Sequence, residues 1–555
     1  MPHLTLTDNN IKNQPSLTTL LQNNVQSQIH AFQDLQSIAG KSLQDLCKNK
    51  SNLLVFPHCL NEHNNGIEEL FICELVGKPN YDGDTICDVE NVKVRTGNLM
   101  GFIGLGGNKN HNTKLEIRSR FTENTNANVQ DYFLHYMLEK VFRINLFDMN
   151  YSHSKNDGFD LLFLIFPYLL KRALRQGIFR TYRTFHKNDA AVKGVIDINR
   201  HIKQNTPFNG KIAYHSREYS ADNDITQLIR HTIEFLKQKE IGNSLLNSDN
   251  DAKDAVKQIV AATDSSYCFQ NRAKVIHNNL RPINHPYYSG YKYLQQLCLL
   301  ILRHQSMQYS QSNSPVYGIL FDGAWLWEEY LATILCNPKL AEKQFLHPSN
   351  KTGKGGIRLF DNSKNDDDEI AFSKCYRRIY PDFYRKNKLS VQAESEKLGS
   401  SENDSIILDA KYKHLENGFV RDDLYQIISY MHTMKIATGG FIYPKKVDDG
   451  LLRRFAPRND KKMLAFSNDK EMLASCHDRT KLDFFNVEDY CFSGERGFEA
   501  VDFEFLKTYK LANDTGTVSR IAFPVPQNAK KYSEFKIFME NAEKSMLNPF
   551  LRTIP

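Results

Sequence analysis

The stretch Ser405-Ile-Ile-Leu-Asp409-Ala-Lys411-Tyr412 decides the fold of the C-terminal part of the chain. Its run of β-branched and apolar residues predicts a strand. Side chains alternate between the two faces of a strand, so Asp409 and Lys411 share one face while the apolar residues around them can be buried on the other. A carboxylate and an ammonium group therefore lie side by side on one face of a predicted sheet.

A second β-type run, residues 378–384, contains the pair Pro381-Asp382. If the two strands pair, Asp382 comes close to Asp409, and two carboxylates near one point suit Mg²⁺, with Mn²⁺ as a substitute. The metal can activate a water molecule and polarise a phosphodiester. Lys411 can orient that water or neutralise charge in the transition state. The sequence thus predicts Asp382, Asp409 and Lys411 as catalytic residues, with both aspartates as metal ligands.

Two predicted helices supply further candidates. In residues 422–434, Gln426 and Tyr430 are four positions apart and so share a helical face. Upstream, a helical pattern carries Glu328 and Glu329, either of which can complete the metal site; we favour Glu328.

The ordered series of Glu, Pro-Asp, Asp-x-Lys and Gln-x-x-x-Tyr resembles nucleases of the PD-(D/E)xK type. This resemblance implies an α/β nuclease fold, Gln426 as a further catalytic residue and Glu328 as a third metal ligand. The alternative is a surface β-hairpin in which the Asp-Lys pair is incidental.

The length of 555 residues suggests two to four domains, at about 150 residues each. We predict a multidomain α+β protein with four parts. These are a flexible lead-in with one short helix (1–50), a β-rich N-terminal domain (51–125), a central helical domain (126–310) and a C-terminal α/β nuclease domain with an extension (316–555).

The β-rich part contains the glycine cluster Gly101-Phe-Ile-Gly-Leu-Gly-Gly107. It lacks the Lys-Ser/Thr of a P-loop, and no helical pattern follows it directly. The cluster therefore predicts β-turns rather than a nucleotide site.

Apolar residues at helical spacing predict the helices of the central part. Asp224 and Gln227 resemble a capping box at the start of one of them. The predicted ranges are 161–179, 222–236, 251–263 and 288–308.

Composition limits the partners and the compartment. The formal net charge is only +7, so any nucleic-acid surface must be local. The ten cysteines include no C-x-x-C pair, and Cys59, Cys73 and Cys87 are predicted to be buried free thiols rather than zinc ligands. No secretory signal begins the chain, and the longest apolar run, 161–170, is too short to span a bilayer. We expect a cytoplasmic protein without a membrane partner.

Residues 171–187 are basic, without an acidic residue and with interleaved aromatic side chains. One interpretation is a surface that contacts DNA phosphates or a partner protein, with aromatic stacking. The other is a helix with aromatic side chains in the core and a solvated basic face. The candidate contact residues are Arg172, Arg175, Arg180 and Arg183.

Two further stretches, together with the nuclease series, resemble the McrC family of McrBC-type and LlaJI-like restriction systems. They are Val192-Lys-Gly-Val-Ile-Asp-Ile-Asn-Arg-His-Ile-Lys-Gln-Asn205 and Tyr214-His-Ser-Arg-Glu-Tyr-Ser-Ala-Asp-Asn223. The resemblance implies an endonuclease of antiphage defence that cuts double-stranded DNA, including modified DNA, together with a McrB-like AAA+ GTPase. It also implies that the β-rich and helical parts dock on the motor and stimulate GTP hydrolysis.

Two rival functions stay open at this point. One is a self-sufficient endonuclease that recognises its own site through residues 171–187. The other is a non-catalytic adaptor that regulates a motor NTPase, although the complete set of Asp382, Asp409 and Lys411 disfavours it.

Overall fold

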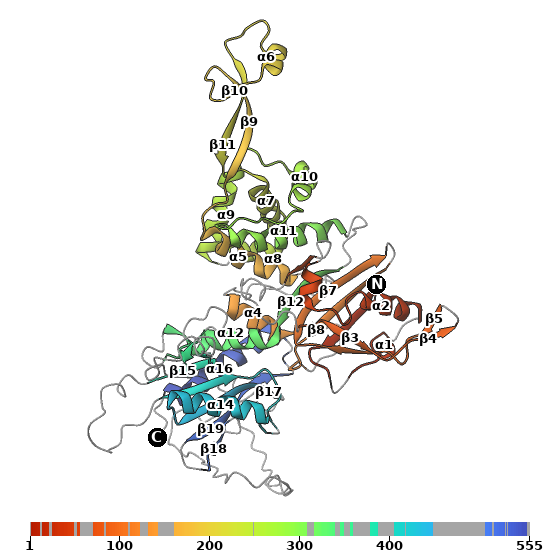
Figure 1. Cartoon of the computed structure of the whole chain (residues 1–555), viewed down its shortest axis with the longest axis vertical. Coiled ribbons are helices and arrows are strands. Elements are labelled where there is room, and N and C mark those ends of the chain that lie inside the picture. The colour runs from red at the N-terminus through yellow and green to blue at the C-terminus, as the bar shows by residue number, and fades with distance from the viewer. Residues whose placement is uncertain are drawn as a thin grey trace, which may run out of the picture. The chain divides into compact units, whose positions relative to one another are not determined.

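The protein is described by a computed structural model in which most, but not all, of the chain is placed (Figure 1). The described residues are 2–11, 14–21, 25–48, 53–55, 70–82, 85–108, 111–122, 131–142, 160–247, 249–307, 316–338, 344–348, 356–358, 378–386, 405–416, 418–447, 506–512, 516–527, 529 and 531–551.

The chain divides into two compact units that are not consecutive in sequence. The first unit comprises residues 1–60, 66–117 and 142–321. The second comprises residues 61–65, 118–141 and 322–555. Most of the expected β-rich and helical parts therefore belongs to the first unit, but residues 118–141, at their junction, belong to the second. The boundary expected near residues 310–316 lies just before the division at Phe321.

The first unit is built on a five-stranded sheet. Its order is β1 (His3–Thr7), β8 (His111–Arg118), β7 (Leu99–Asn108), β12 (Val316–Asp322) and β2 (Leu53–Val55). Strands β7 and β8 are antiparallel, whereas β12 and β2 are parallel. Two antiparallel two-stranded sheets accompany this sheet: β3 (Cys73–Val76) pairs with β6 (Lys93–Thr96), and β4 (Asn80–Asp82) pairs with β5 (Thr85–Asp88).

The prediction of a flexible lead-in over residues 1–50 is wrong. Besides β1, this segment forms three helices, α1 (Leu17–Leu20), α2 (Val25–Gln36) and α3 (Leu43–Lys48). Leu4 and Leu35 are fully buried in the core of the sheet. The abundant Asn, Gln and Ser residues hid the few apolar positions, which are nevertheless spaced to fill one side of a strand and a helix.

The glycine cluster lies within strand β7, so the prediction of β-turns is also wrong. Gly101 has φ +136°, and a Cβ there would lie 2.2 Å from the carbonyl oxygen of Ile319 in β12. Gly318 has φ +150°, and its Cβ would lie 2.2 Å from the Phe102 oxygen. Glycine inside a strand commonly marks such a close approach of two backbones.

Replacing Gly101 with Ala is expected to lower the free energy of unfolding by at least about 2 kcal/mol, because φ strain and a backbone clash add up. Gly40→Ala is the control, since Gly40 also has positive φ but nothing within 4 Å of its Cβ position. Denaturant unfolding of both variants measures the effect. Equal stabilities would mean that β7 and β12 can separate without cost.

The rest of the first unit is mainly helical. Its longer helices are α5 (Asp160–Leu174), α7 (Asp224–Lys237), α9 (Asn250–Thr263) and α11 (Ser289–Met307), with the shorter α8 (Glu240–Leu246) and α10 (Arg272–Asn278). These agree with the predicted ranges except that α5 ends earlier. The cap of α7 is Asn223, which forms a capping box with Thr226 instead of the predicted pair.

From these helices projects an antiparallel hairpin, β9 (Thr181–Asp189) with β11 (Ile212–Ser220) (Figure 1). The short β10 (Val195–Ile196) pairs with β11, and α6 (Ile198–Gln204) lies near the far end. We call residues 181–220 the arm. The helical interpretation of residues 171–187 is wrong beyond Leu174, because α5 ends there and Tyr182 and Phe185 lie on strand β9.

The second unit contains a five-stranded sheet in the order β15 (Phe383–Arg385), β16 (Ile406–Ala410), β17 (Thr438–Val447), β19 (Thr517–Pro526) and β18 (Leu506–Lys510). The central strands β16, β17 and β19 are parallel, and both edge strands are antiparallel. Strands β13 (Ile357–Arg358) and β14 (Arg378–Ile379) form a separate pair.

Helices α4 (Tyr132–Phe142), α12 (Gly323–Leu335), α14 (Arg421–Met434) and α16 (Tyr532–Leu551) accompany this sheet. Buried Ile407 and Phe441 pack with Ile427 of α14 in its core. The predicted helices and strands of this part are present, although the run 378–384 is interrupted between β14 and β15. Strand β16 is an inner strand, so the alternative of a surface hairpin is wrong.

None of the described helices combines the length and the apolar character needed to cross a bilayer.

Candidate active site

The pairing of β15 with β16 brings the two predicted aspartates together. Phe383 is opposite Leu408 in the antiparallel register, so one step further places Asp382 opposite Asp409. The Ala410 amide donates a hydrogen bond of 2.7 Å to Oδ2 of Asp382. Asp382 is thus held by the backbone of the strand that carries Asp409, although it lies just outside β15.

Lys411 lies beside Asp409, as the alternation of the strand predicts. Its Nζ is 2.6 Å from Oδ2 of Asp409 and donates a 2.9 Å hydrogen bond to Oε1 of Gln426. Gln426 in turn donates to the Tyr430 hydroxyl, 2.9 Å away. The helical face that carries Gln426 and Tyr430 therefore faces Lys411 and fixes the position of its ammonium group.

Asp423 is a member of this cluster that sequence reasoning missed. It is buried near the start of α14, with one carboxylate oxygen 3.6 Å from Nζ of Lys411 and the other 2.5 Å from Nζ of Lys413. A carboxylate in the first turn of a helix is common for capping reasons, so the sequence carries no separate signal for this role.

The other side of Asp382 is held by His347, which sequence reasoning also missed. Its Nδ1 lies 2.6 Å from the Asp382 carbonyl oxygen, and its ring stacks on Phe383. Its Nε2 lies 3.7 Å from Oε1 of Glu328. A lone histidine in a connecting segment gives no pattern from which this contact could be predicted.

The two neighbouring glutamates of α12 act on different groups. Glu328 is near enough to help raise the pKa of Asp382, after burial and the charge of Asp409. Glu329 instead adds to the raised pKa of Cys336, which is mainly an effect of burial. The geometry therefore favours Glu328 over Glu329 as the glutamate of the cluster.

The electrostatics of the aspartates fit a bound cation. Burial, then the charge of Asp409, raises the pKa of Asp382 well above its ordinary value. Burial raises the pKa of Asp409 as well, although Lys411 opposes the shift. Burial would lower the pKa of Lys411, but the charge of Asp409 outweighs it and the pKa is raised. One ammonium group thus faces more negative charge than it can neutralise.

The Asp409 carboxylate has unused capacity to bind a ligand. It is 1% exposed, and within the described part of the chain neither oxygen accepts a hydrogen bond of ordinary geometry; Lys411 contacts it as an ion pair. Two adjacent carboxylates with such oxygens are the donor set of a hard divalent cation. Asp382 and Asp409 therefore fit Mg²⁺, and Glu328 is near enough to Asp382 for its charge to raise the pKa of that residue.

The four basic candidates belong to the first unit, whereas the cluster belongs to the second. Arg172 lies on α5, Arg175 just after it and Arg180 before β9. Arg183 on β9 forms a 2.9 Å ion pair with Asp222. Their contact with DNA or a partner stays a prediction.

The cysteines of the β-rich part differ from the expectation in one case. Cys73 is buried, and burial raises its pKa to about 12, but Cys87 on β5 is exposed. Cys59 lies outside the described residues.

Comparison with known proteins identifies the class. The model of a family described as "McrBC 5-methylcytosine restriction system component" matches residues 94–444, well over half of the chain. The match includes residues 192–223 of the arm and its junction with α7, and also Asp382, Asp409, Lys411 and Gln426. The protein is a restriction-system component. It belongs to the McrBC 5-methylcytosine restriction system component family, which confirms the family resemblance.

Two solved structures are similar to the chain at low identity. One is a refined half-complex from a tetradecameric assembly of Thermococcus gammatolerans McrB AAA+ hexamers with bound McrC; it shares 12% identity, with 98% of this chain and 99% of that chain covered and a TM-score of 0.39. The other, a Thermococcus gammatolerans McrBC complex, shares 11% identity, with 61% and 88% covered and a TM-score of 0.27. No curated protein sequence matches the chain.

Proposed function

We propose that this chain is the McrC-type, DNA-cleaving subunit of a McrBC restriction system and hydrolyses phosphodiesters with Mg²⁺. The observation that carries the proposal is the cluster of Asp382, Asp409 and Lys411 on neighbouring strands of a sheet in a restriction-system family member. This arrangement also supports a nuclease domain of the PD-(D/E)xK type.

In this proposal Asp382 and Asp409 bind the metal ion, and Glu328 is the third metal ligand. When bound, Mg²⁺ supplies an activated water molecule and stabilises charge on the phosphodiester oxygens. His347 positions Asp382 through its carbonyl oxygen and links it to Glu328. Both contacts limit how far the carboxylates can move when DNA enters.

Lys411 has the second role. Its raised pKa keeps the ammonium charged, so that it can hold the attacking water or neutralise the developing charge on the phosphate. Gln426 accepts one of its three hydrogens and is itself fixed by Tyr430. We therefore propose Gln426 as the residue that directs the ammonium group toward the scissile phosphate.

The proposed partners follow from family membership. A component of a McrBC system works with a McrB-like AAA+ GTPase on double-stranded DNA, modified DNA included. The arm and the helices from which it projects, which carry residues 192–223, are the proposed region that docks on the motor and stimulates GTP hydrolysis.

Lys411→Gln is expected to slow DNA cleavage by about 10²–10³-fold, the usual cost of losing one group that stabilises transition-state charge. The matched control is Lys413→Gln, because Lys413 contacts Asp423 but not the aspartate pair. The measurement is cleavage of double-stranded DNA by the variant with its GTPase partner, GTP and Mg²⁺. Comparable losses in both variants, or none in Lys411→Gln, would contradict the assigned role.

A further inference from the structure

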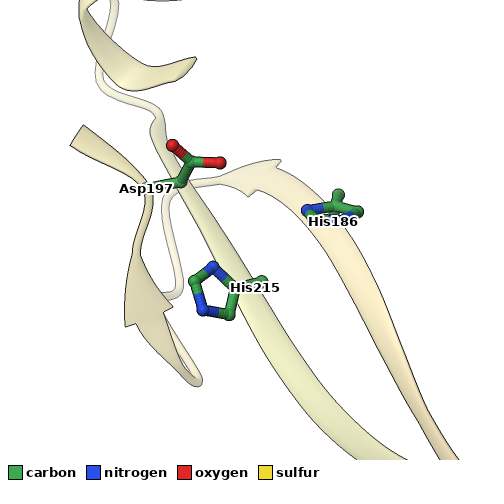
Figure 2. Close-up of side chains that lie close together, drawn as sticks. All are labelled: His186, Asp197 and His215. Carbon is green, nitrogen blue, oxygen red and sulfur yellow. The ribbon is translucent and has the colours of Figure 1, made fainter. Parts of the chain in front are cut away.

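A second group of metal-binding side chains lies on the arm in the first unit. His186 of β9 and His215 of β11 are directly opposite each other in the antiparallel register, with ring centroids 6.1 Å apart. Asp197, between β10 and α6, is the third member (Figure 2). One ligand atom from each residue lies within 4.8 Å of the other two. Among the described residues, no other group of three His, Cys, Asp or Glu side chains meets this condition.

We propose that His186, Asp197 and His215 bind a divalent transition-metal ion, for which Zn²⁺ is the best match. Two imidazoles and one carboxylate are a common donor set of zinc, with water in the fourth position. Mg²⁺ is disfavoured because it prefers oxygen ligands only. The site is separate from the aspartate pair of the second unit and does not depend on the proposed nuclease activity.

The separation of the ligand atoms suits this ion after a small adjustment. With bonds of ~2.1 Å in a tetrahedron, two ligands of zinc lie about 3.4 Å apart. The present separations are at most 4.8 Å, so none of them has to shorten by more than about 1.4 Å. His186 is exposed and can rotate toward the other two without repacking a core.

Among the described residues, the imidazoles of His186 and His215 have no polar partner. Nδ1 of His215 is buried and has no hydrogen-bond partner, which is costly for a polar atom. Neither the His186 nor the His215 side chain forms a hydrogen bond or ion pair with the described residues, in contrast to that of His201 on α6, whose Nδ1 contacts Asn205 and the Ala213 amide. A metal ion would satisfy the unpaired nitrogen.

Asp197 already orients its carboxylate toward this place. It caps α6 by accepting a 3.1 Å hydrogen bond from the Arg200 amide through Oδ1, and its own amide donates to the Ala213 oxygen. A carboxylate has about four acceptor positions, so capping leaves room for a metal. Gly194 permits the close passage, because a Cβ there would lie 2.2 Å from the His215 oxygen.

Metal binding would join three segments of the arm: β9, β11 and the start of α6. Val195, Ile196 and Ile198 stand next to Asp197 and are 65%, 47% and 66% exposed. Only two residue pairs connect β10 to β11, so this segment has few backbone contacts of its own. The ion would therefore fix the position of an exposed apolar surface.

The test is titration of the untagged, metal-free full-length chain with Zn²⁺ by calorimetry, and with Co²⁺ by visible absorption. His186→Gln and Asp197→Asn are the site variants; Asn keeps the helix cap while removing the charge. His277→Gln, an exposed histidine at the end of α10, is the matched control. We expect the wild type and the control to bind one more equivalent of Zn²⁺ than the site variants do. If the site variants still bind that equivalent, their affinity for it should be at least about tenfold weaker.

Hydrogen exchange gives an independent measurement. Zn²⁺ is expected to slow exchange of amides in β9, β10 and β11 of the wild type but not of Asp197→Asn, because only the complete site joins the three segments. Titrations and exchange rates that are the same in the wild type and both site variants would overturn the proposal. Neither measurement involves DNA cleavage, so the result is separate from that of the proposed nuclease.

Discussion

Asp409→Asn is expected to abolish DNA cleavage, with a loss of at least about a thousandfold, while the protein stays folded. Asn has the same size, so the apolar side of β16 remains packed. Removing the charge takes away a proposed metal ligand and the ion-pair partner of Lys411 at 2.6 Å. The measurement is cleavage of double-stranded DNA in the complete system, with circular dichroism as the test of folding.

The matched control is Asp422→Asn, since Asp422 lies on α14 but is exposed and outside the cluster. GTP hydrolysis by the partner provides a second measurement. Asp409 belongs to the second unit, whereas residues 192–223 belong to the first, so the variant should stimulate the motor as the wild type does. Cleavage at the wild-type rate by Asp409→Asn would refute the site, and cleavage without any partner would favour a self-sufficient enzyme.

Metal removal is the second large effect that we expect. Chelation by EDTA should end cleavage, Mg²⁺ or Mn²⁺ should restore it, and Ca²⁺ should not support turnover, because its looser coordination activates water poorly. GTP hydrolysis by a motor also needs Mg²⁺, so cleavage alone does not locate the metal. Calorimetric titration of the isolated chain with Mn²⁺ locates it. One equivalent of Mn²⁺ should be lost in Asp382→Asn and kept in Asp422→Asn; equal binding by both variants would place the metal outside the aspartate pair.

The same titration should depend on pH. The pKa of Asp382 is raised in the folded protein, so its carboxyl stays protonated to a higher pH than an exposed one. A proton and a metal compete for the carboxylate, so Mn²⁺ affinity should fall as the pH is lowered through this raised pKa. In the metal-free protein, folding stability depends on pH in the opposite direction to Mn²⁺ affinity. The stability that Asp382 contributes is present at low pH and is lost as the pH rises through the raised pKa.

The sequence predicted well where one strand determines both packing and chemistry. The alternation in residues 405–412 is enough to place Asp409 and Lys411 on one face, and the four-residue spacing is enough to bring Gln426 and Tyr430 together. Asp423 and His347 could not be predicted in the same way. Their contacts depend on how a helix and a connecting segment pack on the sheet, which local spacing does not encode.

The errors in the first unit have the same origin. The glycine cluster has a local preference for turns, but Gly101 is required by the approach of β12, more than two hundred residues later in the sequence. The polar composition of residues 1–50 predicts flexibility, whereas the positions of a few leucines decide that the segment folds onto the sheet. Long-range pairing therefore overrides composition in both places.

Strand β12 ends at Asp322, and the carboxylate of that residue caps α12 by accepting from the Ala324 amide. The strand completes one unit and the helix opens the other, with no spacer between them. Residues 118–141, moreover, are inserted into the sequence of the first unit but belong to the second. Truncation of the chain at one position therefore cannot yield either unit intact. A fragment ending at residue 315, for example, would lack β12, an inner strand of its own sheet. Exchange of the second unit between such systems by recombination would require residues 118–141 to move together with residues 322–555, and one breakpoint cannot achieve this.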